Sequence, residues 1–340
     1  MNDILKRVVS GETLSEKEAF ATMDAIMKGE ATTGQLMSML SVMSYRGETV
    51  DEMTGFVQAM RENMMKLDVQ DDSVVDTCGT GGDGASTFNI STAVSIILAS
   101  MGVKVAKHGN RKVSSRSGSA DVLETLGIPI DTTPEEGAKA LQEKGMTFMF
   151  APLYHQAMKH AGPARKELGF RTVFNLLGPM SNPANARRQL IGIYDTGYAE
   201  KMAEALYNLG SKHVLLATGR DGLDEITITG ITDLVELKDG IISRTTVTPE
   251  DLGLTRGKLE DIQIEKTEQS AAMIEAVMLG NANESATTIV TMNAAAGLYV
   301  AGKAEDLRDG VKQVQEAIQT GVTRRYFESV AVEREDRQYA

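Results

Sequence analysis

Several features that would assign this sequence to a particular class of protein are missing from it. Cys78 is the single cysteine, so an internal disulfide is excluded and a reducing cytoplasm is expected. No apolar run reaches the length of a membrane-spanning helix, and residues 1–7 lack the apolar core of a signal peptide. The formal net charge of −12 argues against a surface that binds nucleic acid non-specifically. We therefore expect a soluble, cytoplasmic protein without nucleic-acid or membrane partners.

Tryptophan is absent as well, whereas methionine is abundant. The chain has 19 methionines, whose flexible side chains adapt to irregular gaps in a core. Met53, Met60 and Met64 follow helical spacing and are interpreted as core residues rather than as ligands. The length of 340 residues is sufficient for one large domain with a smaller one attached, and therefore for a substantial core.

The pattern of apolar residues changes near residue 71. Before it, the sequence is helical throughout, with capping boxes such as Thr49-Val-Asp-Glu52. After it, β-rich runs alternate with helical ones, which is typical of an α/β domain with a mainly parallel central sheet. The predicted domains are a small all-helical N-terminal domain (1–71, joined by part of 153–188) and a larger α/β domain (72–152 and 189–340).

Individual elements follow from the same periodicity. The predicted helices are 16–28, 33–44, 50–66, 91–101, 119–126, 134–144, 154–167, 267–279, 284–301 and 304–319. The predicted strands are 74–75, 103–106, 129–130, 148–151, 189–193 and 212–217, followed by a hairpin within 226–247.

The segment 76–92 carries the strongest functional signal. It places four glycines, Gly79, Gly81, Gly82 and Gly84, between a short strand and a buried helix. Glycine allows backbone N–H groups to converge on one ligand, and the helix N-terminus adds free donors, so the segment predicts an anion site, most simply for phosphate. Asp83 inside the loop would repel phosphate unless a cation lies between them.

A second segment, 107–119, decides between two kinds of phosphate ligand. The spacing Gly79-x-Gly81-x-x-Gly84 formally matches a dinucleotide-binding fingerprint, which needs an acidic residue after the next strand. The sequence has Lys107-His-Gly-Asn-Arg-Lys112 there instead. With four cationic side chains and four serines, 107–119 favours a highly phosphorylated ligand, although a solvated basic loop would look similar.

Two further sites are open to more than one interpretation. Asp224 and Glu225 suit Mg²⁺ if both face a cleft, and otherwise form an exposed acidic turn. Arg165 could bind a carboxylate through paired hydrogen bonds, or it is an ordinary surface arginine.

Taken together, these segments resemble the anthranilate phosphoribosyltransferases, a family of tryptophan biosynthesis. The likeness runs in order along almost the entire chain. The matching motifs are Asp76-Thr-Cys-Gly-Thr-Gly-Gly-Asp-Gly84, Phe88-Asn-Ile-Ser-Thr92, Lys107-His-Gly-Asn-Arg111 with Ser114-Ser115, Gly118-Ser-Ala-Asp121, Arg171-Thr-Val-Phe-Asn-Leu-Leu-Gly-Pro179, Gly222-Leu-Asp-Glu225 and Asn293-Ala-Ala-Ala296.

The resemblance implies a magnesium-dependent transfer of the ribosyl phosphate of phosphoribosyl pyrophosphate to the amine of anthranilate, with release of pyrophosphate. It implies two Mg²⁺ ions per subunit, bound by Ser91, Asp224 and Glu225, and a homodimer formed through the helical domain. Anthranilate would meet Gly79, Asn110 and Arg165. The residues implied for phosphoribosyl pyrophosphate are Gly79, Gly82, Asp83, Thr87, Asn89, Ile90, Ser91, Thr92, Lys107, His108, Gly109, Asn110, Arg111, Lys112, Val113, Ser114, Ser115 and Ser119.

Two other functions compete with this one. A pyrimidine nucleoside phosphorylase shares the general architecture, but its chemistry gives the acidic pair at Asp224 no evident task. A non-catalytic nucleotide-binding regulator could dispense with both the acidic pair and the basic loop. No general base is assigned, and His108 is the best-placed candidate by sequence.

Overall fold

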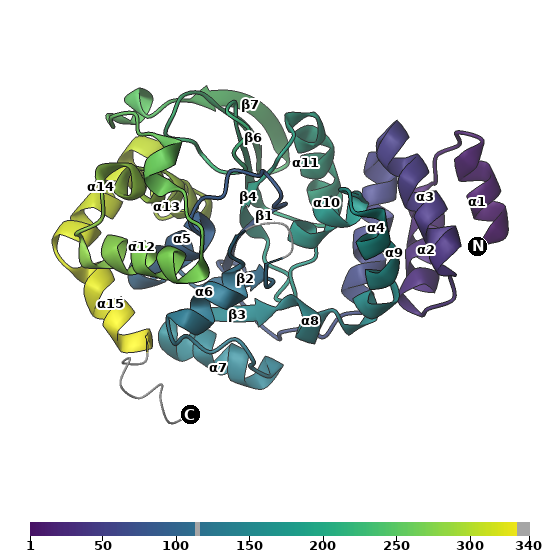
Figure 1. Cartoon of the computed structure of the whole chain (residues 1–340), viewed down its shortest axis with the longest axis horizontal. Coiled ribbons are helices and arrows are strands. Elements are labelled where there is room, and N and C mark those ends of the chain that lie inside the picture. Colours follow the sequence, from purple (N-terminus) through teal and green to yellow (C-terminus); the bar gives the residue numbers. More distant parts are fainter. Residues whose placement is uncertain (113–115, 332–340) are drawn as a thin grey trace.

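The computed structural model describes residues 1–112 and 116–331. At the N-terminus, helices α1–α4 form a bundle that lies at one end of the molecule (Figure 1). Helices α2, α3 and α4 each begin with a capping box, in which a Ser or Thr side chain and the Glu or Gln three residues later satisfy free backbone N–H groups. The helices are α1 (Asn2–Val9), α2 (Glu16–Met27), α3 (Thr33–Arg46) and α4 (Val50–Glu62).

The rest of the chain builds a twisted sheet with helices on both faces. Within the described ranges the sheet has seven strands in the order β3-β2-β1-β4-β5-β6-β7, parallel from β3 to β5 and antiparallel at β6 and β7. The predicted fold class, a helical N-terminal domain with a larger α/β domain and a mainly parallel sheet, is confirmed. The strands are β1 (Val75–Gly79), β2 (Val105–Gly109), β3 (Met146–Phe150), β4 (Arg188–Gly192), β5 (His213–Gly219), β6 (Thr232–Lys238) and β7 (Ile241–Val247).

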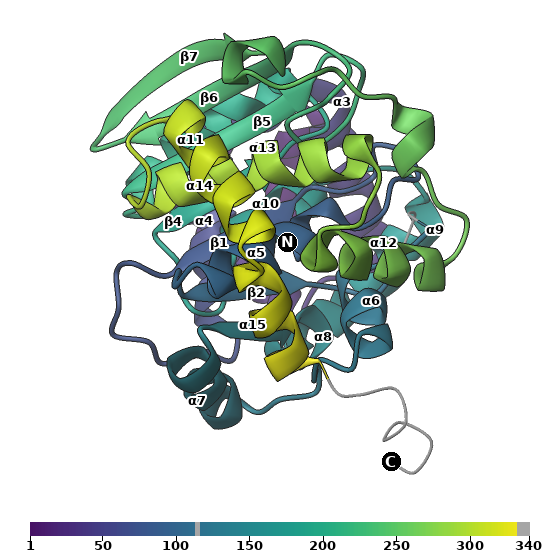
Figure 2. The same cartoon turned by 90° about the vertical axis from the view of Figure 1, so that its left-hand side faces the viewer.

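The helices that follow the bundle divide between the two faces of the sheet. Helices α5 and α12–α15 lie on one side, whereas α10 and α11 lie on the side of the bundle (Figures 1 and 2). The helices are α5 (Ile90–Ser100), α6 (Ser119–Thr125), α7 (Pro134–Lys144), α8 (Ala151–Tyr154), η1 (Gln156–His160), α9 (Gly162–Leu168), α10 (Val173–Met180), η2 (Thr196–Tyr198), α11 (Ala199–Asn208), η3 (Glu250–Leu252), η4 (Leu259–Ile262), α12 (Thr267–Leu279), α13 (Glu284–Ala301), α14 (Leu307–Gln319) and α15 (Val322–Val330). No helix among them, or in the bundle, is long and apolar enough to cross a lipid bilayer, as far as the described part of the chain goes.

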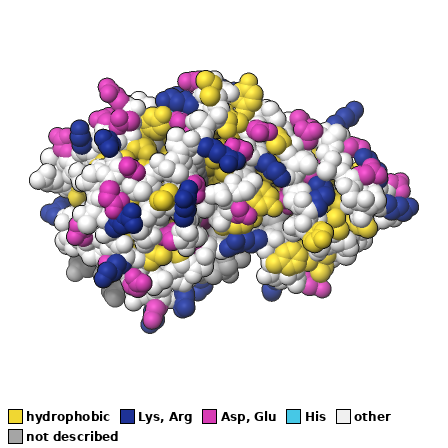
Figure 3. Space-filling view, turned by 90° about the horizontal axis from the view of Figure 1, so that it is seen from above, with side chains coloured by type: hydrophobic (Ala, Val, Ile, Leu, Met, Phe, Trp, Pro, Cys, Tyr) yellow, Lys and Arg dark blue, Asp and Glu magenta, His cyan; other side chains and the backbone are white. Residues whose placement is uncertain are grey.

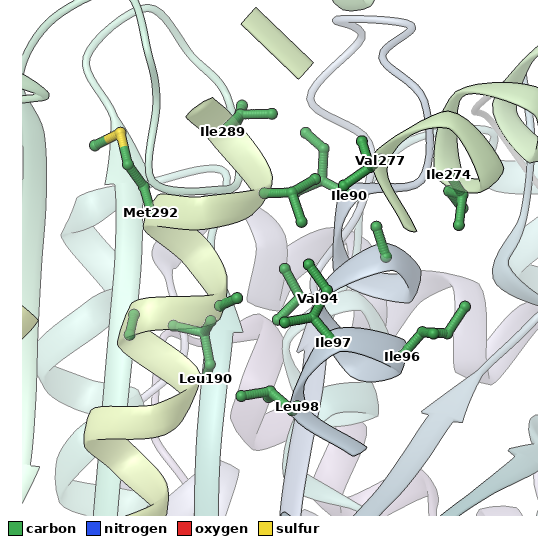
Figure 4. Close-up of a cluster of buried hydrophobic side chains, with 14 of the residues drawn as sticks. Ile90, Val94, Ile96, Ile97, Leu98, Leu190, Ile274, Val277, Ile289 and Met292 are labelled. Carbon is green, nitrogen blue, oxygen red and sulfur yellow. The ribbon is translucent and has the colours of Figure 1, made fainter. Parts of the chain in front are cut away.

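Each face of the sheet has its own apolar core. On the α5 side, side chains of α5, α12, α13 and β4 meet in one buried cluster, of which Ile90, Val94 and Ile289 are examples (Figure 4). The second core joins the bundle to the sheet through α10 and α11, and Cys78 of β1 belongs to it as a free, buried thiol. Helices α9 and α10 pack against α3 and α4, so this later part of the chain returns to the bundle.

The predicted elements differ from the observed ones in a few places. Pro129-Ile130 forms no strand, because two apolar residues are too few to pair and lie in the connection between α6 and α7. The single helix predicted for 154–167 is three short pieces, because His155 leaves helical geometry (φ −110°, ψ 56°) and Pro163 begins a new helix. Helices α1, α10, α11 and α15 were not predicted individually, although Met202, Ala203 and Leu206 give α11 a buried stripe.

Candidate active site

A cleft of about 670 Å³ opens at the carboxyl ends of the parallel strands. Strand β1 has β2 on one side and β4 on the other, and the chain returns to β4 only after completing β2 and β3. Ligands of open α/β sheets bind at such a switch point, because the loops leaving the two strands diverge there. From above, the surface is notched between the larger and smaller parts of the molecule, with Lys and Arg side chains near its middle (Figure 3).

The glycine loop forms one wall of the cleft. It leaves β1 at Gly79 and ends at Asn89, whose Oδ1 accepts a hydrogen bond from the Thr92 N–H at the start of α5. Gly81, Gly82 and Gly84 have positive φ angles, a region that L side chains rarely adopt. The loop and the free N–H groups of the α5 N-terminus therefore face the cleft together, as an anion site requires.

The acidic pair lies opposite this loop. The Gly81 N–H donates to Asp224 Oδ2 over 2.8 Å, and the Ser91 N–H hydrogen-bonds to the carboxylate of Glu225. The Asp224 backbone passes directly against Gly192 at the end of β4, where a Cβ would lie 1.6 Å from the Asp224 carbonyl oxygen. The structure thus brings Asp224, Glu225 and Ser91 to one place, from segments far apart in the sequence.

The negative charge of this wall is poorly compensated by the protein. Both carboxylates keep some surface on the cleft but are set deep in it. Burial, with the neighbouring carboxylates of Asp83 and Glu225, raises the pKa of Asp224 well above its usual range. Burial also raises the pKa of Glu225 to about 8, against the lowering effect of Lys107. A cation bound here would relieve this repulsion.

Magnesium fits the donor set. In the described part of the chain, no group of three His, Cys, Asp or Glu side chains is arranged to hold a metal ion on its own. Mg²⁺ prefers oxygen ligands and usually combines one or two carboxylates with water and substrate phosphates. Two carboxylates and the Ser91 hydroxyl on a phosphate-type loop match that preference.

Lys107 belongs to the basic segment 107–119, but its side chain is buried beneath the site rather than exposed in the cleft. It is 1% exposed, does not line the cleft, and donates from Nζ to the Thr77 carbonyl (2.5 Å) and to Ser91 Oγ (3.0 Å). Burial lowers the pKa of Lys107, and the carboxylate of Asp76 opposes this effect. The ammonium group therefore supports Ser91 from beneath the site.

The other wall of the cleft is more apolar. His108 and His155 are buried with ring centroids 4.9 Å apart, and burial lowers the pKa of both, so that the rings are neutral near pH 7. The Arg165 guanidinium lies 5.2 Å from the centroid of the Phe174 ring. Burial lowers the pKa of Arg165, and no described carboxylate forms an ion pair with it. This wall suits a flat, aromatic anion.

Most of the site residues predicted from the sequence line this cleft. They are Gly79, Gly82, Asp83, Thr87, Asn89, Ile90, Ser91, His108, Gly109, Asn110, Arg111, Ser119, Arg165, Asp224 and Glu225. Thr92 and Lys112 do not line it, like Lys107, and Val113, Ser114 and Ser115 lie outside the described residues. The Arg111 guanidinium is bound to the carboxylates of Asp121 and Glu124.

Sequence reasoning missed part of the apolar wall. His155, Phe174 and Met60 line the cleft but were not predicted to. The motif from Arg171 to Pro179 contains Phe174, so it was a signal in the sequence that could have placed this residue at the site. Met60 follows the helical pattern of a core residue, so its sequence context did not distinguish it.

Comparisons with known proteins agree with this geometry. The glycosyl transferase family, a/b domain, matches residues 71–324, and the helical bundle domain of that family matches residues 2–64. An anthranilate phosphoribosyltransferase of Geobacillus kaustophilus is 59% identical over 318 residues, which cover 94% of each chain. That of Halalkalibacterium halodurans is 54% identical over 319 residues, covering 94% of this chain and 93% of the relative.

Solved structures give the same picture. The crystal structure of anthranilate phosphoribosyltransferase from Thermus thermophilus has a TM-score of 0.90 and 39% identity, and the match covers 96% of this chain and 97% of that one. The enzyme from Saccharomyces cerevisiae in complex with PRPP and Mg matches in fold, with a TM-score of 0.87 over 96% of this chain and 95% of that one, at 24% identity. Since the relatives match over nearly their full length, the chain belongs to the anthranilate phosphoribosyltransferase family.

Proposed function

We propose that the glycine-loop wall of the cleft binds magnesium phosphoribosyl pyrophosphate, and that the opposite wall binds anthranilate for the transfer reaction of the family. The observation that carries this proposal is the convergence of Asp224, Glu225 and Ser91 on the glycine loop, in the same cleft as Arg165, which forms no ion pair with any carboxylate of the described residues. A diphosphate with its cations satisfies the first group, and a carboxylate satisfies the second.

The assignment of ligands to residues follows the two walls. Gly79, Gly82, Asp83, Thr87 and the residues 89–91 face the diphosphate and ribose, together with the end of β2 and Ser119. Thr92 and Lys107 act through Asn89 and Ser91, to which they are hydrogen-bonded. Arg165 receives the anthranilate carboxylate, beside Asn110 and the Gly79 backbone.

Two magnesium ions are part of the proposal. Ser91 and Glu225 would hold one ion, and Asp224 with Glu225 the other. Metal ions held by these residues would supply positive charge against the departing diphosphate. The S. cerevisiae enzyme, which has the same fold, was solved with PRPP and Mg.

The reaction requires little proton chemistry from the protein. The bond between ribose C1 and the diphosphate oxygen breaks, with its electron pair leaving on the diphosphate, and the amine nitrogen bonds to C1. The nitrogen then loses one proton to the departing diphosphate or to water, which restores a neutral amine. The aromatic amine of anthranilate is neutral at pH 7, so no strong base is needed to activate it. The pKa of His108 is well below its ordinary value because the ring is buried, which makes it a weak base. Rate enhancement would therefore come from positioning and electrostatics.

A homodimer through the bundle is also proposed. Tyr45 on α3 is 94% exposed and Val9 on α1 is 59% exposed. Helices α1 and α3 pack together, so both side chains belong to one helical layer. Half-buried Ile4, Leu5 and Met37 add apolar surface there. Apolar surface gathered on neighbouring helices is typical of a protein interface.

The central test is loss of anthranilate fluorescence on incubation with phosphoribosyl pyrophosphate and Mg²⁺. We expect the wild-type chain to consume anthranilate, and Glu225→Gln to reduce kcat at least about 100-fold, because a carboxylate shared by two ions is lost. Glu328→Gln, on the exposed side of α15, is the matched control and should leave kcat unchanged. Full activity of Glu225→Gln at limiting Mg²⁺ would remove the metal assignment.

A further inference from the structure

Arg171 opens a conspicuous sequence motif but has no part in the assignments above. It lies between α9 and α10, and its side chain is exposed. Its backbone carbonyl accepts a hydrogen bond from Ser44 Oγ of α3 over 3.3 Å, which fixes this residue to the bundle. The guanidinium carbon lies 4.1 Å from the centroid of the Tyr194 ring, within the range of a cation–π contact. Arg171 is therefore fixed by two contacts, one at its backbone and one at its side chain, although its side chain is exposed.

That position is directly behind the glycine loop. A Cβ on Gly82 would meet Arg171 Nε at 3.1 Å and Nη2 at 3.5 Å. The guanidinium therefore touches the loop at a residue with a φ of +79°, in the middle of the run of left-handed glycines. The Tyr194 N–H in turn donates to Thr80 Oγ1 over 3.2 Å, so the surface that carries Arg171 is itself tied to the loop.

The charge of Arg171 is not compensated by an acidic partner. Within residues 1–112 and 116–331, its guanidinium forms no ion pair. Two other cations near the loop are already engaged: Arg111 binds two carboxylates, and Lys107 is buried against Thr77 and Ser91. The wall proposed to bind the diphosphate carries the carboxylates of Asp83, Asp224 and Glu225. A positive charge beside Gly82 offsets part of their repulsion of the diphosphate.

We propose that Arg171 is a positioning residue for the diphosphate: fixed on Tyr194, it supports the turn at Gly82 and supplies positive charge behind the loop. This inference rests on the proposed function, since it assigns the diphosphate to the glycine loop. Arg171 acts through the loop and does not itself line the cleft. It would therefore affect binding of phosphoribosyl pyrophosphate more than binding of anthranilate.

The test compares Arg171→Met, which keeps an unbranched, flexible side chain but removes the charge, with Arg171→Lys, which keeps the charge. Isothermal titration of the full chain with inorganic pyrophosphate and Mg²⁺ measures the affinity of the loop directly. We expect Arg171→Met to weaken this affinity about tenfold and to raise the KM for phosphoribosyl pyrophosphate by a similar factor. The KM for anthranilate should stay within about twofold. Arg171→Lys keeps the charge but loses the planar guanidinium that stacks on Tyr194, so it should recover part of the loss.

Three results would overturn the inference. Equal losses in the Lys and Met variants would mean that packing rather than charge matters. Unchanged pyrophosphate affinity in both would mean that Arg171 has no role at the loop. An equal rise in both KM values would mean general distortion of the cleft.

The control is Arg324→Met on α15, whose wild-type side chain is exposed and bonds to the Leu279 carbonyl. Failure of the wild-type chain itself to consume anthranilate would count against the proposed function instead.

Discussion

Asn293 shows how one buried amide can position a pair of charges that it does not touch. It lies in the middle of α13, is fully buried, and its Oδ1 accepts from the Ile226 N–H over 3.0 Å. Its Nδ2 donates to the Ile226 carbonyl over 3.0 Å and to the Ile289 carbonyl over 2.9 Å. The N–H and the carbonyl of Ile226, the residue after Glu225, are thereby bound to helix α13. This holds the backbone of the acidic pair in place.

Replacing this amide should therefore impair the metal site. We expect Asn293→Leu to leave two buried backbone groups unpaired, lowering the free energy of unfolding by about 2–4 kcal/mol. The Mg²⁺ concentration for half-maximal activity should rise, measured in the fluorescence assay. Thr291→Val is the control, since Thr291 Oγ1 is buried on the same helix without a partner among the described residues, and its loss should change neither quantity. An unchanged Mg²⁺ requirement in Asn293→Leu would contradict this role.

The buried histidine His155 makes stability depend on pH. Burial lowers its pKa from 6.5 to about 4, so between these values the unfolded chain binds a proton that the folded chain does not. Its contribution to stability is complete above pH 6.5 and is lost progressively as the pH falls to about 4, by about 3 kcal/mol. Urea unfolding at pH 7 and pH 5 should show a smaller difference for His155→Gln than for wild type. His160→Gln, at an exposed histidine, should behave like wild type.

At the scale of elements, the end of strand β4 lies directly against the backbone of the acidic pair. Gly192 pairs in register with Gly79 of β1, and the Asp224 backbone crosses directly over it. We expect Gly192→Ala to lower the free energy of unfolding by at least about 2 kcal/mol and to reduce turnover, because a backbone carbonyl cannot move aside cheaply. Urea denaturation and the fluorescence assay measure both. Gly34→Ala on α3 meets no atom within 4 Å and should be close to neutral. Wild-type stability and turnover in Gly192→Ala would show that the loop can shift.

Most elements were predictable because each carried its own local signal. The capping boxes at Ser15 and Thr49 predict the starts of α2 and α4, and the β-rich runs that alternate with helical ones predict the parallel strands. In the helix predicted for 154–167, tertiary packing overrode the local pattern. The break at His155 depends on its bond to the Ser181 carbonyl, 26 residues further along the chain, which no local window contains.

The site was predictable to the extent that its chemistry is local. The glycine loop and the acidic pair each stand out alone, and the cleft unites them. Lys107 was predicted to contact the phosphate ligand and instead lies beneath Ser91, because strand alternation turns its side chain under the loop. The clamp of Asn293 on Ile226 spans 67 positions, so it becomes visible only in three dimensions.

At the scale of the whole molecule, the proposed dimer would form through the outer helices of the bundle. We expect Tyr45→Glu to convert a dimer into a monomer, because a charge would enter an apolar interface. Light scattering coupled to size-exclusion chromatography measures the mass directly. Tyr207→Glu places the same charge at another exposed tyrosine, on α11, and should leave the mass unchanged. A wild-type chain with the mass of one subunit would contradict the proposed dimer outright.

The two walls of the cleft come from different parts of the chain. The glycine loop and acidic pair belong to the sheet and its connections, whereas Met60, Met158 and Phe174 come from the bundle and from the segment that returns to it. On the assignment proposed above, the apolar side of the acceptor site comes from the bundle and the returning segment, while Asn110 and the Gly79 backbone contribute to it from the sheet. Substitutions around Phe174 would then change which aromatic amines the enzyme accepts, while the residues that bind the donor stay unchanged.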